Sequence, residues 1–248
     1  MNAGFRDRRD SGNPAEKISG PAPSVAARAN APRFDMTEAS ALLAPIAVIY
    51  HHRVKRYGAD PKGVYWRHQF GQYLRFELLL GLIPKDRAAR GGLVLNDLGC
   101  GYGAFFDVIR KRTFLRDGLY IGYDICETMV DMAGRRIRDP RARFVQSAVA
   151  CFMADYSFVS GTYNMKLEAD DDSWNAYVKE SLRQLWSCSR SGLAFNMLDV
   201  SGKTEDTGLY YADAGEFTEF CRREMSPDVT LVDNSPLDEW TVLVRRQP

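Results

Sequence analysis

The chain has 248 residues, 45% of them hydrophobic and 26% charged, and its 33 Lys and Arg against 32 Asp and Glu give a formal net charge of +1. This length and composition are typical of one large soluble domain, or of a domain with a small appendage. The balanced charge excludes a global basic field that would attract nucleic acid and an acidic field that would attract basic partners. We expect no membrane span, because no apolar run reaches about 20 residues, and no secretory signal. Five widely spaced cysteines without a C-x-x-C pair favour a reducing cytoplasm and disfavour a metal site.

Residues 1–33 differ in composition from the rest of the chain. Four prolines and three glycines interrupt them, and six basic against three acidic side chains leave this segment at +3. Such a segment carries too little apolar surface to offset the entropy of ordering. It is predicted to be a flexible tail. A transit peptide is the alternative, and the acidic residues and helix breakers disfavour it.

Two helices are predicted next, over residues 35–57 and 64–83, with a Gly- and Pro-containing loop at 58–63 between them. Thr37 is a candidate N-cap of the first helix. Four apolar side chains recur every four residues on one face of the second helix: Phe70, Leu74, Leu78 and Leu82. Together these elements form a predicted N-terminal helical cap over residues 34–91.

From residue 92 onward, short apolar strands alternate with helices, a pattern typical of βαβ units and a mainly parallel sheet. The predicted strands are 93–97, 119–123, 143–146, 156–160, 192–198, 229–232 and 239–245. The predicted helices are 104–112, 127–138, 172–189 and 214–223. Only residues 233–238 separate the last two strands, which is too short for a crossover helix, so the last strand is expected to run antiparallel. The sequence therefore predicts an α/β domain over residues 92–248.

A glycine-rich turn follows the first predicted strand. It reads Asp97-Leu-Gly99-Cys-Gly101-Tyr-Gly103, and it leads directly into a predicted helix. Glycine adopts positive φ and lets a ligand approach the backbone closely. Asp124 ends the next strand 23 residues after Gly101, where a carboxylate can accept hydrogen bonds from both hydroxyls of a ribose. The pattern predicts a nucleoside-containing cofactor at this turn.

Two cofactors compete for this geometry. Gly99-x-Gly101-x-x-Ala104 also satisfies the loose dinucleotide fingerprint. However, Asp97 would repel a pyrophosphate and attract an ammonium or a sulfonium group. Because an unpaired buried carboxylate is costly, Asp97 is also expected to have a cationic or hydrogen-bonding partner. An NAD(P)-dependent oxidoreductase and a non-catalytic subunit with the same fold remain the alternatives.

These motifs resemble those of a known family. D-x-G-x-G-x-G after the first strand is similar to motif I of the class I S-adenosylmethionine-dependent methyltransferases. Gly122-Tyr-Asp124-Ile-Cys126-Glu-Thr-Met129 resembles their G-x-D-x-S-x-x-M segment, with Cys126 in place of the Ser. Residues 154–167 and 209–213 also resemble segments of uncharacterised bacterial methyltransferases. The resemblance implies a Rossmann-like seven-stranded sheet, mostly parallel with an antiparallel last strand, and S-adenosylmethionine as the cofactor.

The resemblance also implies a set of coenzyme-binding residues. The backbone of residues 99–103 would lie under the methionine and ribose portions, and Asp97 would serve the amino end. Asp124 would hold the ribose hydroxyls, with Ile125 and Met129 near the adenine. The implied set is Asp97, Gly99, Cys100, Gly101, Gly103, Asp124, Ile125, Met129, Gln146, Ser147 and Ser160.

The sequence on the adenine side departs from the family pattern, and the sequence on the acceptor side carries less specific motifs. The acidic residue that often follows the third strand is absent, so Gln146 or Ser147 is expected to contact the adenine amino group. Four residues follow the fourth strand, where ligands bind in such sheets, and are expected to face the methyl group: Ser160, Gly161, Tyr163 and Asn164. This run lacks the Asn/Asp-Pro-Pro-aromatic and Pro-Cys signatures of methyltransferases that act on nucleobases. A small-molecule acceptor and no nucleic-acid partner are therefore expected.

Several residues are candidates for catalysis. His51 or His52 could serve as a general base, because an imidazole titrates near neutral pH; a surface or core histidine is the alternative. Asn164 is a candidate for orienting the acceptor, and Tyr210 and Tyr211 are further candidates. Aromatic residues that would pack in the cap or line the acceptor pocket are Tyr50, Tyr57, Tyr65 and Trp66. We expect an S-adenosylmethionine-dependent transfer of a methyl group to an oxygen or nitrogen of a small metabolite.

Overall fold

The computed structural model of the protein describes residue 35 and residues 39–66, 69–203, 208–233 and 237–247. The predicted tail at residues 1–33 and the predicted N-cap Thr37 lie outside the described residues.

The centre of the fold is a sheet with the strand order β3-β2-β1-β4-β5-β8-β7. Its strands are β1 (Val94–Leu98), β2 (Leu119–Asp124), β3 (Ala142–Gln146), β4 (Ala154–Ser160), β5 (Ser189–Asp199), β7 (Val229–Val232) and β8 (Glu239–Arg245). Strand β8 runs antiparallel to β5 and β7, and the other neighbouring pairs on this path are parallel. The predicted α/β class and the antiparallel last strand are confirmed. A further short strand, β6 (Tyr211–Ala212), pairs with β5 and was not predicted.

The helices are α1 (Ala39–Tyr57), α2 (Gln69–Leu80), α3 (Lys85–Ala88), α4 (Ala104–Ile109), α5 (Glu127–Arg136), α6 (Asp171–Ser187) and α7 (Ala214–Glu224). Short 3₁₀ helices are η2 (Pro61–Val64), η3 (Thr113–Leu115), η4 (Thr162–Asn164) and η5 (Val200–Gly202). Among the described helices, none is both long and apolar enough to cross a membrane.

The predicted second helix of the cap is shorter than expected, and the apolar face that its four-residue spacing indicated is only partly buried. Pro61 begins η2, and Tyr65 then adopts a left-handed φ of 63°, which interrupts a helix before α2 begins. On α2, Phe70 is 75% exposed, whereas Gln72 and Phe76 are buried. The four-residue spacing of leucines therefore did not identify the face of α2 that packs on the sheet.

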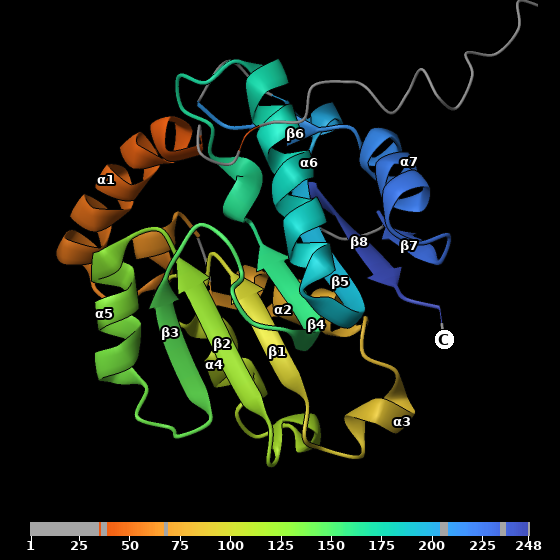
Figure 1. Cartoon of the computed structure of the whole chain (residues 1–248). Coiled ribbons are helices and arrows are strands. Elements are labelled where there is room, and N and C mark those ends of the chain that lie inside the picture. Colours follow the sequence, from red (N-terminus) through yellow and green to blue (C-terminus); the bar gives the residue numbers. More distant parts are fainter. Residues whose placement is uncertain (1–34, 36–38, 67–68, 204–207, 234–236, 248) are drawn as a thin grey trace, which may run out of the picture. The chain divides into compact units, whose positions relative to one another are not determined.

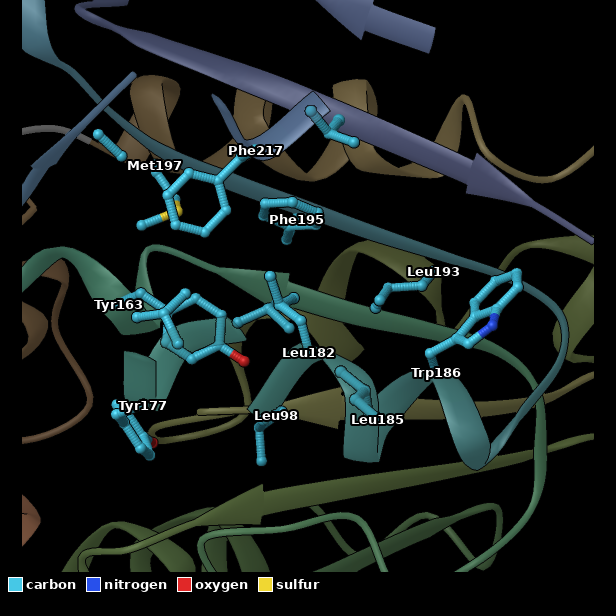
Figure 2. Packing of buried hydrophobic residues seen from close by; sticks show 14 of the residues in the cluster. Leu98, Tyr163, Tyr177, Leu182, Leu185, Trp186, Leu193, Phe195, Met197 and Phe217 are labelled. Carbon is cyan, nitrogen blue, oxygen red and sulfur yellow. The ribbon is translucent and has the colours of Figure 1, made fainter. Parts of the chain in front are cut away.

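Helices cover both faces of the sheet (Figure 1). Helix α6 packs on β5, and α7 on β7 and β8, whereas α2 contacts β4, β5 and β8 and also packs against α4. The division into a cap at 34–91 and a domain at 92–248 stays a prediction. Helix α2, which belongs to the predicted cap, packs directly on the sheet. Figure 2 shows the core between α6 and the sheet, in which Leu182 and Leu185 face Leu193 and Phe195.

The strand order reverses direction at β1. From β1 the chain moves to β2 and β3 on one side, and it returns to β4 on the other side of β1. In parallel sheets of this kind, ligands bind in the crevice beyond the carboxyl ends of the strands at this point. The glycine-rich turn after β1 therefore lies where such a crevice is expected. Figure 1 shows α1 near the same ends of the strands, beside α5.

Leu182→Ala tests the core between α6 and the sheet. The Leu182 side chain is fully buried, so truncation loses buried area and leaves a cavity. We expect the free energy of unfolding to fall by about 2–5 kcal/mol, measured by urea denaturation at an unchanged m-value. Val48→Ala on α1 is the control, because Val48 is 55% exposed; its change should stay within about 0.5 kcal/mol. Equal effects of the two substitutions would contradict this description of the core.

Candidate active site

A pocket with about 930 Å³ of space free of protein atoms, part of it open to solvent, lies at the carboxyl ends of β1, β2 and β4. From the sheet and the segments after its strands it is lined by Asp97, Leu98, Gly99, Cys100, Gly101, Tyr102, Ala104, Phe105, Asp124, Ile125, Met129, Ser147, Ala148, Ser160, Gly161 and Thr162. The N-terminal segment contributes Leu43, Ile46, Tyr50, Val64, Trp66, Gln72 and Phe76, and α6 contributes Tyr177.

The glycine-rich turn requires glycine for two physical reasons. Gly99, Gly101 and Gly103 have φ values of +78°, +53° and +83°, in the left-handed region that other residues avoid. At Gly99 a side chain would also collide, since an added Cβ would lie 2.0 Å from the Thr162 hydroxyl oxygen. Thr162 donates that hydroxyl to the Leu98 carbonyl at 2.9 Å. The turn after β1 is thus pressed against the segment after β4.

Asp124 both supports this turn and faces the pocket. Its two carboxylate oxygens accept hydrogen bonds from the backbone N–H of Gly101 at 2.9 Å and of Cys126 at 2.8 Å. Burial raises the pKa of Asp124 to about 6, although these backbone donors lower it in part. The carboxylate also faces the pocket, where a ribose diol would present two donors.

Asp97 is the second buried carboxylate of the pocket. The hydroxyl of Tyr120 donates to its Oδ2 atom, which is the expected hydrogen-bonding partner. Burial is the main reason that the pKa of Asp97 is raised to about 7; the hydrogen bond from Tyr120 lowers it in part, and the nearby charge of Asp124 contributes to the rise. Among the described residues, no basic side chain lowers the pKa of Asp97 or of Asp124. The pocket therefore holds two acidic groups whose ionised forms lack a described cationic partner.

The structure brings most of the other predicted coenzyme residues into this pocket. Cys100, Ile125, Met129, Ser147 and Ser160 line it. The Ser160 hydroxyl is buried and forms no hydrogen bond with the described residues.

Gln146 lies outside the pocket, unlike Ser147. Its side chain is exposed and donates to the Ile125 carbonyl at 3.3 Å. Ser147, the alternative partner for an adenine, lines the pocket and donates its hydroxyl to the Val149 carbonyl at 2.7 Å.

The two candidate histidines do not line the pocket. The His51 Nδ1 atom lies 2.7 Å from the Thr128 hydroxyl of α5, and His52 is exposed. Leu43, Ile46 and Tyr50 occupy the pocket face of α1. Successive helical residues are about 100° apart around the axis, so His51 and His52, one and two positions after Tyr50, are turned away from the pocket.

Asn164 and Tyr210 also lie outside the pocket lining. The buried Asn164 side chain accepts the Leu198 N–H at 3.2 Å through Oδ1. The Tyr210 hydroxyl accepts a hydrogen bond from Asn175 at 2.9 Å, and burial raises its pKa to about 12. Both side chains therefore connect elements around β5 and α6. The partly buried Tyr211 belongs to β6 and is likewise outside the pocket.

Sequence reasoning missed several lining residues. Tyr50 and Trp66 belong to the predicted aromatic group, but no local signal separated them from Tyr57 and Tyr65, which do not line the pocket. The lining residues without any prediction of this role are Leu43, Ile46, Val64, Gln72, Phe76, Leu98, Phe105, Ala148, Thr162 and Tyr177. The spacing of Leu43, Ile46 and Tyr50 along one helical face was the available signal.

Comparison with known proteins identifies the family. No protein-family model matches the chain. A protein of Mycobacterium tuberculosis named "Putative methyltransferase Rv1506c" is 39% identical over 157 residues, which cover 61% of this chain and 92% of that protein. The α/β fold and the acidic, glycine-lined pocket define a Rossmann-like transferase scaffold. The chain belongs to the class I S-adenosylmethionine-dependent methyltransferases.

Solved structures share this fold at low sequence identity. A magnesium protoporphyrin IX methyltransferase from Synechocystis, solved with bound S-adenosylmethionine, has a TM-score of 0.56 at 14% identity, covering 81% of this chain and 97% of that one. A methyltransferase from Leishmania major has a TM-score of 0.56 at 10% identity, covering 81% and 82%. The [4+2]-cyclase SpnF has a TM-score of 0.50 at 18% identity, covering 82% and 75%. The scaffold is therefore shared with a protein that is named for a different reaction.

Gly99→Ala tests the close approach of the turn to Thr162. We expect the free energy of unfolding to fall by more than about 1 kcal/mol, because a left-handed alanine is strained and its Cβ meets Thr162. Gly134→Ala is the control, since nothing lies within 4 Å of an added Cβ at this helical glycine; it should stabilise the protein by about 0.5–1 kcal/mol. Thermal and urea unfolding measure both. Stabilisation by Gly99→Ala would refute the described turn.

Asp97→Asn tests the cost of the buried carboxylate. The folded-state pKa of about 7 lies above the ordinary aspartate pKa of 3.8, so the folded protein binds more protons between these values and loses stability as pH rises through them. The Asn variant lacks this loss and can still accept from Tyr120. Without ligand, it should be more stable than the unsubstituted protein at pH 8, by at least about 1.4 kcal/mol for one pKa unit. The difference should vanish near pH 4. The measurement is the free energy of unfolding of both proteins between pH 4 and pH 8. Parallel pH profiles would contradict the raised pKa of Asp97.

Proposed function

We propose that this methyltransferase binds S-adenosylmethionine in the pocket at the ends of β1, β2 and β4, and transfers its methyl group to an oxygen or nitrogen atom of a small, largely apolar molecule. The observation that carries the proposal is the pair of buried carboxylates, Asp97 and Asp124, around a left-handed glycine turn. A coenzyme with a sulfonium and an ammonium group supplies the positive charge that these carboxylates lack. A pyrophosphate would add negative charge to the same place.

The contacts of the pocket support one orientation of the coenzyme. The Asp124 carboxylate faces the pocket and would accept hydrogen bonds from the ribose hydroxyls. Ile125 and Met129 offer apolar surface beside it for the adenine, with Ser147 at the same end. The Gly99 backbone and Asp97 then receive the methionine portion. The methyl group would face the segment after β4, where Gly161 lies.

The chemistry needs little from the protein beyond alignment. The acceptor lone pair attacks the methyl carbon in line with the carbon–sulfur bond, whose electron pair leaves on sulfur to give S-adenosylhomocysteine. The sulfonium already activates this carbon, so positioning and exclusion of water account for most of the protein's contribution. Leu43, Ile46 and Phe76 supply an apolar wall suited to excluding water.

The described pocket lining contains no histidine that would act as a general base. Burial raises the pKa of Tyr50 and of Tyr177, which makes both hydroxyls donors rather than bases near neutral pH. The acceptor is therefore expected to bind with its reacting lone pair already available, as in a neutral amine or an acidic hydroxyl. In this proposal, alignment of the acceptor accounts for the transfer, and neither His51 nor His52 acts as a general base.

Binding of S-adenosylhomocysteine tests the coenzyme site. We expect micromolar binding by isothermal titration calorimetry and none of NAD(H). Asp124→Ala should weaken binding at least tenfold, because a buried charged contact of this kind contributes about 1.5–3 kcal/mol. Asp155→Ala is a matched control, since the Asp155 carboxylate also accepts a backbone N–H, from Val94 at 2.8 Å, outside the pocket. Equal affinities of the two variants would place the ribose elsewhere, and binding of NAD(H) alone would overturn the function.

The affinity for S-adenosylmethionine should depend on pH. Binding a cation lowers the pKa values of Asp97 and Asp124 from about 7 and about 6, so affinity is greatest above pH 7 and falls as pH decreases through these values. We expect the dissociation constant to be at least tenfold larger at pH 5.5 than at pH 7.5. Asp97→Asn should bind more weakly and show a flatter profile. A pH-independent affinity in the unsubstituted protein would exclude these carboxylates as partners of the cation.

A further inference from the structure

A buried polar chain runs behind the acceptor side of the pocket. The Arg75 guanidinium of α2 donates to both carboxylate oxygens of Glu239 on β8, each at 2.7 Å. The two side chains are only 12% and 3% exposed. Glu239 also accepts from the Asn196 side-chain amide of β5, and the Asn196 Oδ1 atom accepts the Gly161 N–H at 2.9 Å. The chain thus connects an ion pair between α2 and β8 to the pocket residue Gly161.

The same ion pair reaches Gly161 by a second route through Trp66. The Arg75 guanidinium carbon lies 3.9 Å from the centre of the Trp66 ring. The indole in turn lies against Gly161, where an added Cβ would come within 2.6 Å of Trp66 Cζ2. Both Trp66 and Gly161 line the pocket. Two independent sets of contacts from one arginine therefore converge on one wall of the pocket.

The position of Gly161 identifies which part of the pocket this wall bounds. Gly161 follows β4 and precedes Thr162, whose side chain presses against Gly99 of the glycine turn. The nucleoside end, marked by Asp124 and Met129, belongs instead to β2 and α5. The Trp66 indole thus lies at the methyl-transfer side.

A buried ion pair is weak evidence of a contribution to stability, because desolvation offsets most of the attraction. The Arg75–Glu239 pair does have a geometric effect. A guanidinium held by two parallel hydrogen bonds has a fixed plane, so the indole packed on it is fixed too. The pairing also uses the charge of Arg75, so this cation is not free to bind an anionic acceptor.

We propose that Trp66 sets the size of the acceptor, and that Arg75 and Glu239 are positioning residues that hold its indole over Gly161. The ligand is a flat, uncharged, apolar or aromatic molecule that packs on the indole with its nucleophilic atom directed at the methyl group. This inference rests on the proposed function for the identity of the neighbouring coenzyme. The position of the indole can be tested without any ligand.

The first experiment measures that position. Subtracting the emission of a Trp66→Phe counterpart from each protein isolates the fluorescence of Trp66, and acrylamide quenching reports its accessibility. In the absence of ligand, we expect the quenching constant to rise at least twofold in Arg75→Ala and in Glu239→Gln. Glu77→Gln is the matched control, because Glu77 also lies on α2 and pairs with an arginine, Arg112, but both side chains of this pair are partly exposed. If Arg75→Ala does not fold, Arg75→Lys replaces it, since lysine lacks the planar fork.

The second experiment measures the size of the acceptor site with two neutral fluorescent probes, 2-naphthol and 1-aminoanthracene, at saturating S-adenosylhomocysteine. Trp66→Ala should shift the ratio of their affinities at least fivefold towards the three-ring probe. Glu239→Gln should shift it in the same direction by a smaller factor. The affinity for S-adenosylhomocysteine should stay within twofold, and Glu77→Gln should change neither quantity.

Each other outcome overturns a defined part of the proposal. An unchanged quenching constant in Glu239→Gln would remove the positioning role. An unchanged probe ratio in Trp66→Ala, or no probe binding by the unsubstituted protein, would remove the acceptor wall. An equally large loss of S-adenosylhomocysteine affinity would assign the indole to the coenzyme. If S-adenosylhomocysteine did not bind at all, the proposed function would fail, while the ligand-free quenching result would still decide the position of Trp66.

Discussion

The pocket depends on two buried carboxylates that have no described basic partner. Burial raises the pKa values of Asp97 and Asp124 to about 7 and about 6. At neutral pH, ionisation of these buried groups without a bound cation therefore destabilises the folded protein. A hydroxyl from Tyr120 and backbone N–H groups reduce this cost without supplying charge. A cationic ligand would supply it. Stability of the empty protein and affinity for the ligand are therefore opposed at this site.

The sheet and the glycine turn place these carboxylates together. β1 and β2 pair in parallel, with Leu98 opposite Tyr123, so Asp97 near the end of β1 and Asp124 at the end of β2 lie at the same edge of the sheet. The turn then bends sharply in the left-handed region, and Asp124 accepts the Gly101 N–H from within it. One acidic side chain thus supports the loop and lines the pocket. Changes at Asp124 consequently affect the shape of the turn as well as any ligand contact.

The N-terminal segment supplies most of the other side of the pocket, and its character differs from that of the turn. Leu43, Ile46 and Phe76 are apolar, and Trp66 is stacked by an arginine whose charge is used by Glu239. A site of this composition favours an uncharged acceptor and transfer by alignment. In the proposed function, the acidic side of the pocket binds the coenzyme and the apolar side binds the acceptor.

The alternation of strands and helices, the antiparallel last strand and the positions of Asp97, the glycines and Asp124 could be predicted from the amino-acid order. They rest on local periodicity and on the length of connections, which a single sequence contains. The direction in which each helix faces could not be predicted. His51 and His52 are turned away from the pocket, and Phe70 is exposed, because long-range packing sets the rotation of a helix about its axis. Arg75 and Glu239 are separated by 164 positions. No local pattern relates such residues, and only the folded chain brings them into contact.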